Sequence, residues 1–231
     1  MLNTNDVFDF HTHTFLTDGE LSAIELIRRA VVKGYKAIAI TDHCGMHDQE
    51  RILEILVREC EVASKEMGIV AVPGVELTHL PVSLIDEAAR KAKGLGAQIV
   101  IVHGETVTEP VQAGTNKAAL SSAYVDVLAH PGFLTQEEAE LAKKNGIYVE
   151  LTSRKGHSLT NGHVARTALS AGAPMVVDSD AHAPEDLLTA VLAQQVARGA
   201  GLPQDQALTT LQHNPRALLK QLHRLPSALS L

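Results

Sequence analysis

Two histidines stand two residues apart near the start of the chain, in the segment FDFHTHTFLTDGE that begins at Phe8. The preceding residues alternate between apolar and acidic side chains, which indicates a β-strand. In an extended chain, residues i and i+2 point to the same side, so His11 and His13 project together. Two convergent imidazoles can chelate a metal ion, although a solvated histidine pair at a strand end would have the same spacing.

Metal-binding residue types also follow most of the other predicted strands. Short apolar runs predict seven strands, at residues 7–11, 37–41, 70–76, 99–103, 125–130, 147–151 and 175–178. The residues near their C-terminal ends that can bind metals are His11, His13, Asp42, His43, Glu76, His103, His130, Asp178, Asp180 and His182. Only the sixth strand contributes none, and six of the twelve histidines belong to this set. Scattered surface histidines would not follow the strand periodicity, so we predict a metal site.

The ligand types and their number constrain the metal. Imidazole and carboxylate ligands without thiolate suit Zn, Mn or Fe. A single zinc ion takes three or four protein ligands, so the set predicts two to three divalent ions.

The segments between the strands carry helix signals, such as the capping patterns that begin at Ser22 and Thr135. Strands that alternate with helices predict a parallel sheet with right-handed crossovers. The 231 residues give 231/7 = 33 residues for each strand–helix unit. Strand ends that converge on one centre require a closed sheet, so we predict an α/β barrel formed by residues 1–231 as a single domain.

Six short motifs strengthen this interpretation. FHTH, TDH, PGVE, VHGE, LAHPG and DSDAH occur in this order between residues 7 and 182. With them the chain resembles the polymerase-and-histidinol-phosphatase (PHP) family. The resemblance implies a distorted (β/α)7 TIM-like barrel, a trinuclear metal centre and metal-dependent phosphoesterase activity.

The resemblance also implies which residues hold each ion. The first set is His11, His13, Glu76 and Asp180; the second is Glu76, His103 and His130; the third is Asp18, His43 and His182. Some relatives have histidine at the position of Asp18. Asp42 is expected to orient a histidine, Asp178 to cap a strand end, and His79 to lie on a surface loop.

The loop after the sixth strand contains candidate substrate-binding residues, which are Arg154, Lys155 and His157. The planar guanidinium of Arg154 fits phosphate oxygens, so we expect Arg154 to contribute to catalysis as well as to binding. The two cysteines, Cys44 and Cys60, do not form a zinc-type spacing.

The composition of the chain limits which binding partners and which cellular location we expect. The net charge of −7, without a basic stripe, disfavours long nucleic acids. The N-terminus lacks the features of a signal peptide and no apolar run is long enough for a membrane span, so we expect a cytoplasmic protein. The oligomeric state is not predicted.

Together these features predict hydrolysis of a small phosphomonoester by a hydroxide that bridges two ions. The alternatives are a phosphodiesterase or exonuclease on short oligonucleotides, and a non-catalytic accessory domain that binds metal. Hydrolysis of a C–N bond is a further option, but amidohydrolase barrels commonly use a carboxylated lysine, and the predicted rim has no lysine.

Overall fold

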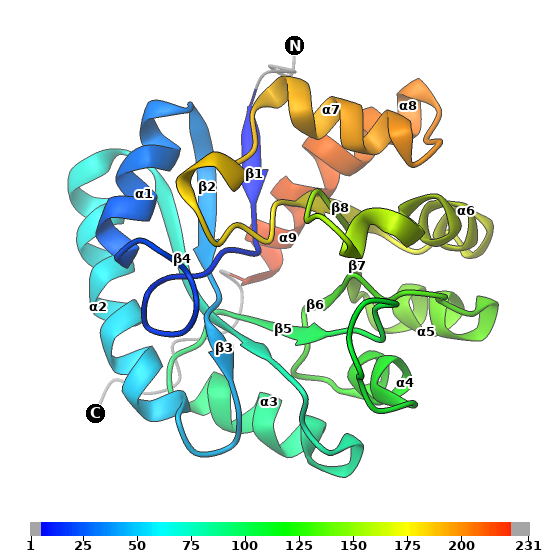
Figure 1. The fold of residues 1–231 in the computed structure, drawn as a ribbon, viewed down its shortest axis with the longest axis horizontal. Coiled ribbons are helices and arrows are strands. Elements are labelled where there is room, and N and C mark those ends of the chain that lie inside the picture. Colours follow the sequence, from blue (N-terminus) through cyan, green and yellow to red (C-terminus); the bar gives the residue numbers. More distant parts are fainter. Residues whose placement is uncertain (1–5, 223–231) are drawn as a thin grey trace.

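The computed structural model describes residues 6–222, in which parallel strands gather at the centre and helices surround them (Figure 1). The strands are β1 (Val7–Asp9), β2 (Tyr35–Ile40), β3 (His43–Cys44), β4 (Val70–Leu77), β5 (Ile99–His103), β6 (Val127–Ala129), β7 (Tyr148–Thr152) and β8 (Met175–Asp178). Their order is β1-β2-β4-β5-β6-β7-β8, and the short β3 pairs with β4. All these pairings are parallel.

The sheet is nearly closed between its first and last strands. A parallel bridge joins Thr12 to Ala181, and the His13 amide donates to the Ala181 carbonyl over 2.9 Å. The Phe10 amide donates to the carboxylate of Asp178 over 2.6 Å. The predicted α/β barrel of seven principal strands is therefore confirmed.

The helices lie on the outside of the barrel (Figure 1). They are α1 (Ala23–Val32), α2 (Gln49–Met67), α3 (Ile85–Gly94), α4 (Thr115–Ser121), α5 (Gln136–Asn145), α6 (Asn161–Ala171), α7 (Ala190–Gly199), α8 (Gln204–Leu208) and α9 (Asn214–Leu222). The Ser22 hydroxyl accepts from the Glu25 amide, and Thr135 forms the predicted capping box with Glu138.

One helix closes the base of the barrel interior. Residues of the strands, including Phe8, Ala39 and Ile101, form a buried cluster with Leu218 and Leu222 of α9. Pro215 is the second residue of α9 and closely follows a π-helical turn formed by residues 209–213. Proline has no amide hydrogen to donate to the preceding turn, which fits irregular winding just before it.

With one end of the interior filled by α9, the opposite end is free for polar side chains. This is the end to which the carboxyl termini of the parallel strands point. Among the described residues, no helix is long and apolar enough to cross a membrane.

Candidate metal centre

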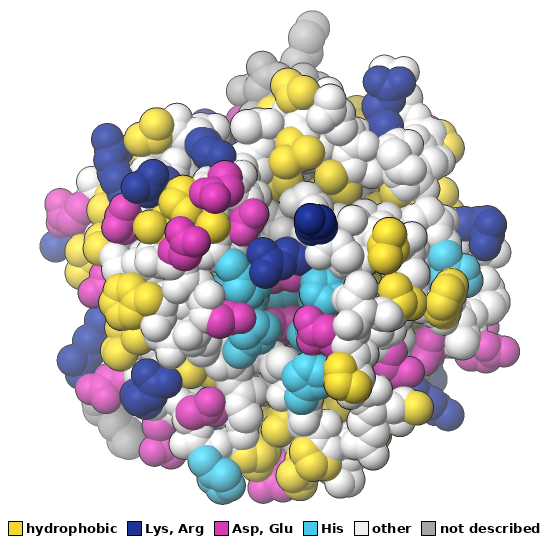
Figure 2. Space-filling model, in the orientation of Figure 1, with side chains coloured by type: hydrophobic (Ala, Val, Ile, Leu, Met, Phe, Trp, Pro, Cys, Tyr) yellow, Lys and Arg dark blue, Asp and Glu magenta, His cyan; other side chains and the backbone are white. Residues whose placement is uncertain are grey.

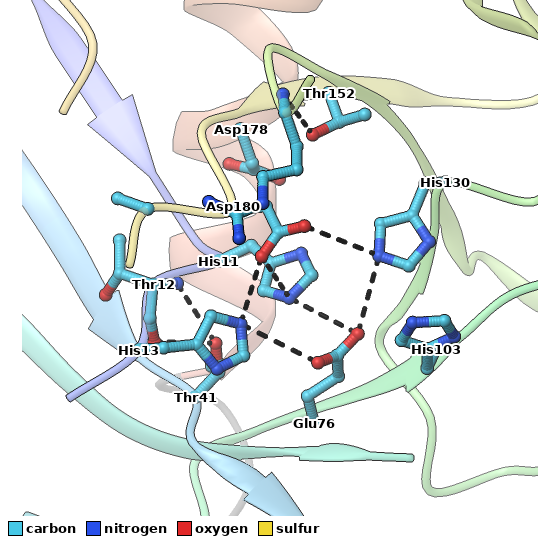
Figure 3. A network of polar contacts seen from close by, with 12 residues as sticks. His11, Thr12, His13, Thr41, Glu76, His103, His130, Thr152, Asp178 and Asp180 are labelled. Atoms are coloured by element: carbon cyan, nitrogen blue, oxygen red, sulfur yellow. Dashed lines mark hydrogen bonds and ion pairs between the residues drawn. The ribbon is translucent and has the colours of Figure 1, made fainter. Parts of the chain in front are cut away.

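Figure 2 shows histidine and acidic side chains around a hollow near the centre of one face. Glu76, at the end of β4, lies in the middle of this cluster (Figure 3). Its Oε1 atom is 3.3 Å from His11 Nε2 and 3.6 Å from His130 Nε2. Its Oε2 atom is 2.7 Å from His43 Nδ1 and 3.6 Å from His13 Nε2. One carboxylate thus contacts four imidazoles through two different oxygens.

Asp180 closes the same cluster from the loop after β8 (Figure 3). Its Oδ1 lies 3.2 Å from His13 Nε2, and its Oδ2 lies 3.7 Å from His130 Nε2. The ligand atoms of His11, His13 and Asp180 form one candidate metal group, and those of His11, Glu76 and His130 form another. The two groups adjoin one another, and the two oxygens of Glu76 reach histidines of both, so this carboxylate is the residue that can serve two ions side by side.

A third group lies nearer to solvent. The Oδ2 atom of Asp18 is 3.4 Å from His43 Nε2 and 3.2 Å from His182 Nε2, and His13 completes the group. The structure thus brings Asp18, His43 and His182 together, as the resemblance implied. The Asp18 side chain is 53% exposed, whereas the Glu76 side chain is fully buried.

Several buried ligand atoms lack hydrogen-bond partners. They are His11 Nε2, both ring nitrogens of His13, Glu76 Oε1 and His130 Nδ1. A buried polar atom without a partner is costly, and a bound cation removes that cost for a lone-pair donor. The donor set therefore fits divalent metal ions.

Mutual electrostatics keep the acids of this cluster ionised. Burial raises the pKa of the Glu76 carboxyl, but the charges of His11 and His43 outweigh it and hold that pKa well below the usual range. Burial also opposes the ionisation of Asp180, yet His11 and His13 lower its pKa. Both carboxylates are thus available as ligands at neutral pH.

The imidazoles differ in their protonation. Burial lowers the pKa of His103 to about 4, which leaves its ring neutral and ready to bind metal. For His43 the penalty of burial is outweighed by Glu76 and Asp18, which raise its pKa to about 10. A cation that binds His43 at pH 7 must therefore displace a proton.

The sixth principal strand contributes a carboxylate that sequence reasoning missed. Glu150 of β7 is fully buried, and its Oε2 lies 2.7 Å from His11 Nδ1. This contact holds Nδ1 as the donor and directs Nε2 of His11 toward Glu76, which is a common support for metal-binding histidines. A single acid inside the apolar run YVELT was the signal available in the sequence.

Asp42 and Asp178 bind backbone and hydroxyl groups. Asp42 Oδ1 accepts from the Thr14 amide over 2.8 Å and from the Thr17 hydroxyl over 2.7 Å. Asp42 thus acts on His13 indirectly, through the backbone of the loop that follows β1, and not by a hydrogen bond to an imidazole. Asp178 accepts from the Phe10 amide across the β1–β8 junction, as expected for a cap.

The loop after β7 places its candidate residues in three different surroundings. Arg154 lies beside the loop that carries His182, with Nη1 3.3 Å from Asp186 Oδ2. Asp186 in turn accepts from the His182 amide over 3.0 Å. Lys155 is exposed. His157 is buried and stacks on His130 with ring centroids 4.3 Å apart, so it joins the histidine cluster instead of facing solvent.

The loops after β4 and β5 bring two more groups to the cluster. Glu109 was not predicted, since it lies in the loop after β5, four residues beyond the VHGE motif. His79 was expected on a surface loop, and it is 42% exposed, but its Nε2 lies 3.1 Å from Glu109 Oε2. His103 does not form a candidate group with Glu76; instead it groups with His130 and His157, and separately with His79 and Glu109.

Comparisons with known proteins agree with this geometry. The model of the PHP domain family matches residues 9–129. The uncharacterized protein MJ1295 of Methanocaldococcus jannaschii is 48% identical over 93% of this chain and 99% of its own length. A probable phosphatase of Caldanaerobacter subterraneus is 28% identical over 88% of this chain and 87% of its own. Ribonuclease P protein component 3 of Methanosarcina mazei is 26% identical over 94% of this chain and 90% of its own.

A solved structure shares the fold at low sequence identity. It is the histidinol phosphate phosphatase of Lactococcus lactis, in complex with zinc, L-histidinol and phosphate. The match covers 85% of this chain and 94% of that one, with a TM-score of 0.58 and 11% identity. At this identity the likeness establishes the barrel alone.

Proposed function

The chain belongs to the PHP domain family of metal-dependent phosphoesterases, and on this premise we propose that it hydrolyses a small phosphomonoester. The observation that supports the proposal most directly is the buried cluster around Glu76. It presents imidazole and carboxylate atoms without hydrogen-bond partners at the open end of the barrel. Divalent ions in such a cluster supply Lewis acidity toward a phosphoryl group and activate water.

The residues of the chain position these components. Glu76 contacts histidines through both of its oxygens, so it can fix the spacing between two cation positions. Glu150 holds the ring of His11, while Asp42 holds the loop that carries His13. The cluster is therefore preorganised by residues that are themselves buried.

Arg154 is our candidate for binding the phosphate. Its guanidinium is one-third exposed and lies beside the His182 loop, and basic side chains line the edge of the hollow in Figure 2. A guanidinium can donate two hydrogen bonds to a phosphate and stabilise charge that develops during hydrolysis.

A covalent route through cysteine is disfavoured. Cys44 and Cys60 are both buried, and burial raises the pKa of each thiol. A thiol that stays protonated is a poor nucleophile. Direct attack by water is the simpler reaction.

One relative is named a protein component of ribonuclease P, so we keep as a second candidate a metal-bound accessory domain that performs no catalysis of its own. The two candidates differ in a simple measurement. Metal-reconstituted protein is assayed against phosphomonoesters, mononucleotides and short oligonucleotides, with Glu76→Gln as the matched control. Phosphate release by the wild type, but not by Glu76→Gln, supports the phosphatase. Cleavage of oligonucleotides supports a phosphodiesterase. If the protein with full metal content hydrolyses none of these substrates, both enzymatic functions are contradicted.

A further inference from the structure

A second cluster of imidazole and carboxylate groups lies on the outer side of His103. Glu109 Oε2 is 3.1 Å from His79 Nε2 and 3.2 Å from His103 Nε2. The other oxygen, Oε1, is 3.4 Å from His157 Nε2. Three histidines from separate parts of the chain thus surround one carboxylate, and only His103 belongs to the ligand sets that the family resemblance implies.

The spacing of these atoms is that of ligands around one ion. The ligand atoms of His79, His103 and Glu109 all lie within 4.8 Å of one another. Two ligands that are each about 2.1 Å from a divalent ion stand roughly 3 Å apart in octahedral geometry and about 3.4 Å apart in the tetrahedral geometry common for zinc. The two nitrogen–oxygen distances of 3.1 and 3.2 Å lie between these values.

The orientation of His103 favours the outer cluster over the inner one. Its Nδ1 lies 3.2 Å from the Gly104 carbonyl, which can only accept, so Nδ1 carries the proton and Nε2 has a free lone pair. That lone pair faces Glu109. Among the described residues, Glu76 forms ion pairs within 4.0 Å with His11, His13, His43 and His130, but none with His103. Figure 3 likewise shows His103 beside Glu76 without a contact drawn between them.

The backbone of His79 is an independent indication. Its φ angle is 53°, in the left-handed region that residues other than glycine rarely adopt. The other non-glycine residues with positive φ in the described chain are His130 and Asp180, and both place ligand atoms in the inner cluster. Such strain costs energy and concentrates at functional sites. His79 therefore resembles His130 and Asp180 of the inner cluster in its backbone as well as in having a side chain that can bind metal.

We propose that His79, His103 and Glu109 bind a further divalent cation, with His157 holding the second oxygen of Glu109. Two imidazoles and a carboxylate suit Zn or Mn. The side chains of His79 and Glu109 are 42% and 39% exposed, so this ion would be reached directly from solvent at the mouth of the hollow. The proposal does not depend on the hydrolytic function, because metal content alone tests it.

The experiment counts zinc ions. Apoprotein is dialysed to equilibrium against Zn²⁺, and bound zinc is measured by elemental analysis in the wild type, His79→Ala and Glu109→Gln. Exposed residues away from both clusters, His213 and Glu140, provide the controls His213→Ala and Glu140→Gln. Each test variant should bind about one zinc ion fewer than the wild type, while both controls bind the wild-type number.

Either of two results overturns the proposal. If His79→Ala and Glu109→Gln retain the full zinc content, the outer cluster holds no ion. If they lose all their zinc, the two residues support the inner centre and form no separate site. Circular dichroism of each variant checks that the fold is intact, and anomalous scattering from zinc-loaded crystals should show a peak between His79 and Glu109.

Discussion

Glu76 and Arg154 have roles that a pair of substitutions can separate. Glu76→Gln removes a buried negative charge that contacts four imidazoles, so the inner ions lose the group that offsets their mutual repulsion. Metal content and turnover should fall together. Elemental analysis and steady-state kinetics with one aryl phosphate check this, and retention of both metal and rate would contradict the role given to Glu76.

Arg154→Ala should leave the metal content at the wild-type value, because Arg154 contacts Asp186 and no candidate ligand atom. Loss of one preorganised hydrogen-bond donor should lower kcat/KM by a factor that corresponds to about 2 to 4 kcal/mol of transition-state stabilisation. Arg166→Ala, which removes an exposed guanidinium from α6, is the matched control. A rise in KM with kcat unchanged would mean that Arg154 binds the phosphate equally well in the ground state and in the transition state.

Glu150 is a positioning residue, and its role can be tested without a substrate. Glu150→Ala frees the ring of His11, so zinc affinity should fall about 10- to 100-fold, as is typical when such a support is removed. Glu150→Gln retains an oxygen that can accept from Nδ1 and should restore most of the affinity. Competition with a chelator measures both values, and equal affinities for Glu150→Ala and the wild type would refute the role.

At the level of elements, the strands were predictable and the loops were not. Apolar runs fixed the strand positions, and the parallel arrangement required their carboxyl ends to meet, so the proximity of His11, Glu76 and Asp180 followed from the sequence. Glu109 and His79 lie in connections whose path depends on tertiary packing. Substrate binding by His157 stays a prediction, but its contacts could not be predicted for the same reason: its turn brings it within 3.4 Å of Glu109 and onto the ring of His130.

Helix α9 also connects the fold to the site, since Leu218 and Leu222 fill the barrel interior at the end away from the candidate metal centre. Leu218 is fully buried. Leu218→Ala should destabilise the protein by about 2 to 5 kcal/mol through loss of burial and formation of a cavity. Zinc content of the folded variant should be unchanged. Chemical denaturation measures the stability change, and Leu219→Ala, at a partly buried position beside the same cluster, should cost less.

For the molecule as a whole, protons and metals compete for the same cluster, and stability should reveal this competition. In the apoprotein, burial opposes the protonation of His43, but Glu76 and Asp18 outweigh it and raise its pKa to about 10. His43 therefore contributes stability that is complete below its unfolded pKa of about 6.5 and is lost as pH rises toward 10. His11 acts in the same direction, because Glu76 and Glu150 raise its pKa despite burial.

The loss of stability at low pH comes from imidazoles that are held neutral in the folded protein. Burial lowers the pKa of His103 to about 4, so its folded form resists protonation and the protein loses stability as pH falls below about 6.5. The apoprotein should thus have its highest Tm near pH 6.5 and a lower Tm at pH 9. Zinc requires deprotonated imidazoles, so the zinc-loaded protein should gain stability relative to the apoprotein across this interval. Thermal scans of both forms from pH 5 to pH 9 test the prediction: an apoprotein Tm that rises steadily above pH 6.5 would mean that His43 and His11 are not protonated in the metal-free cluster.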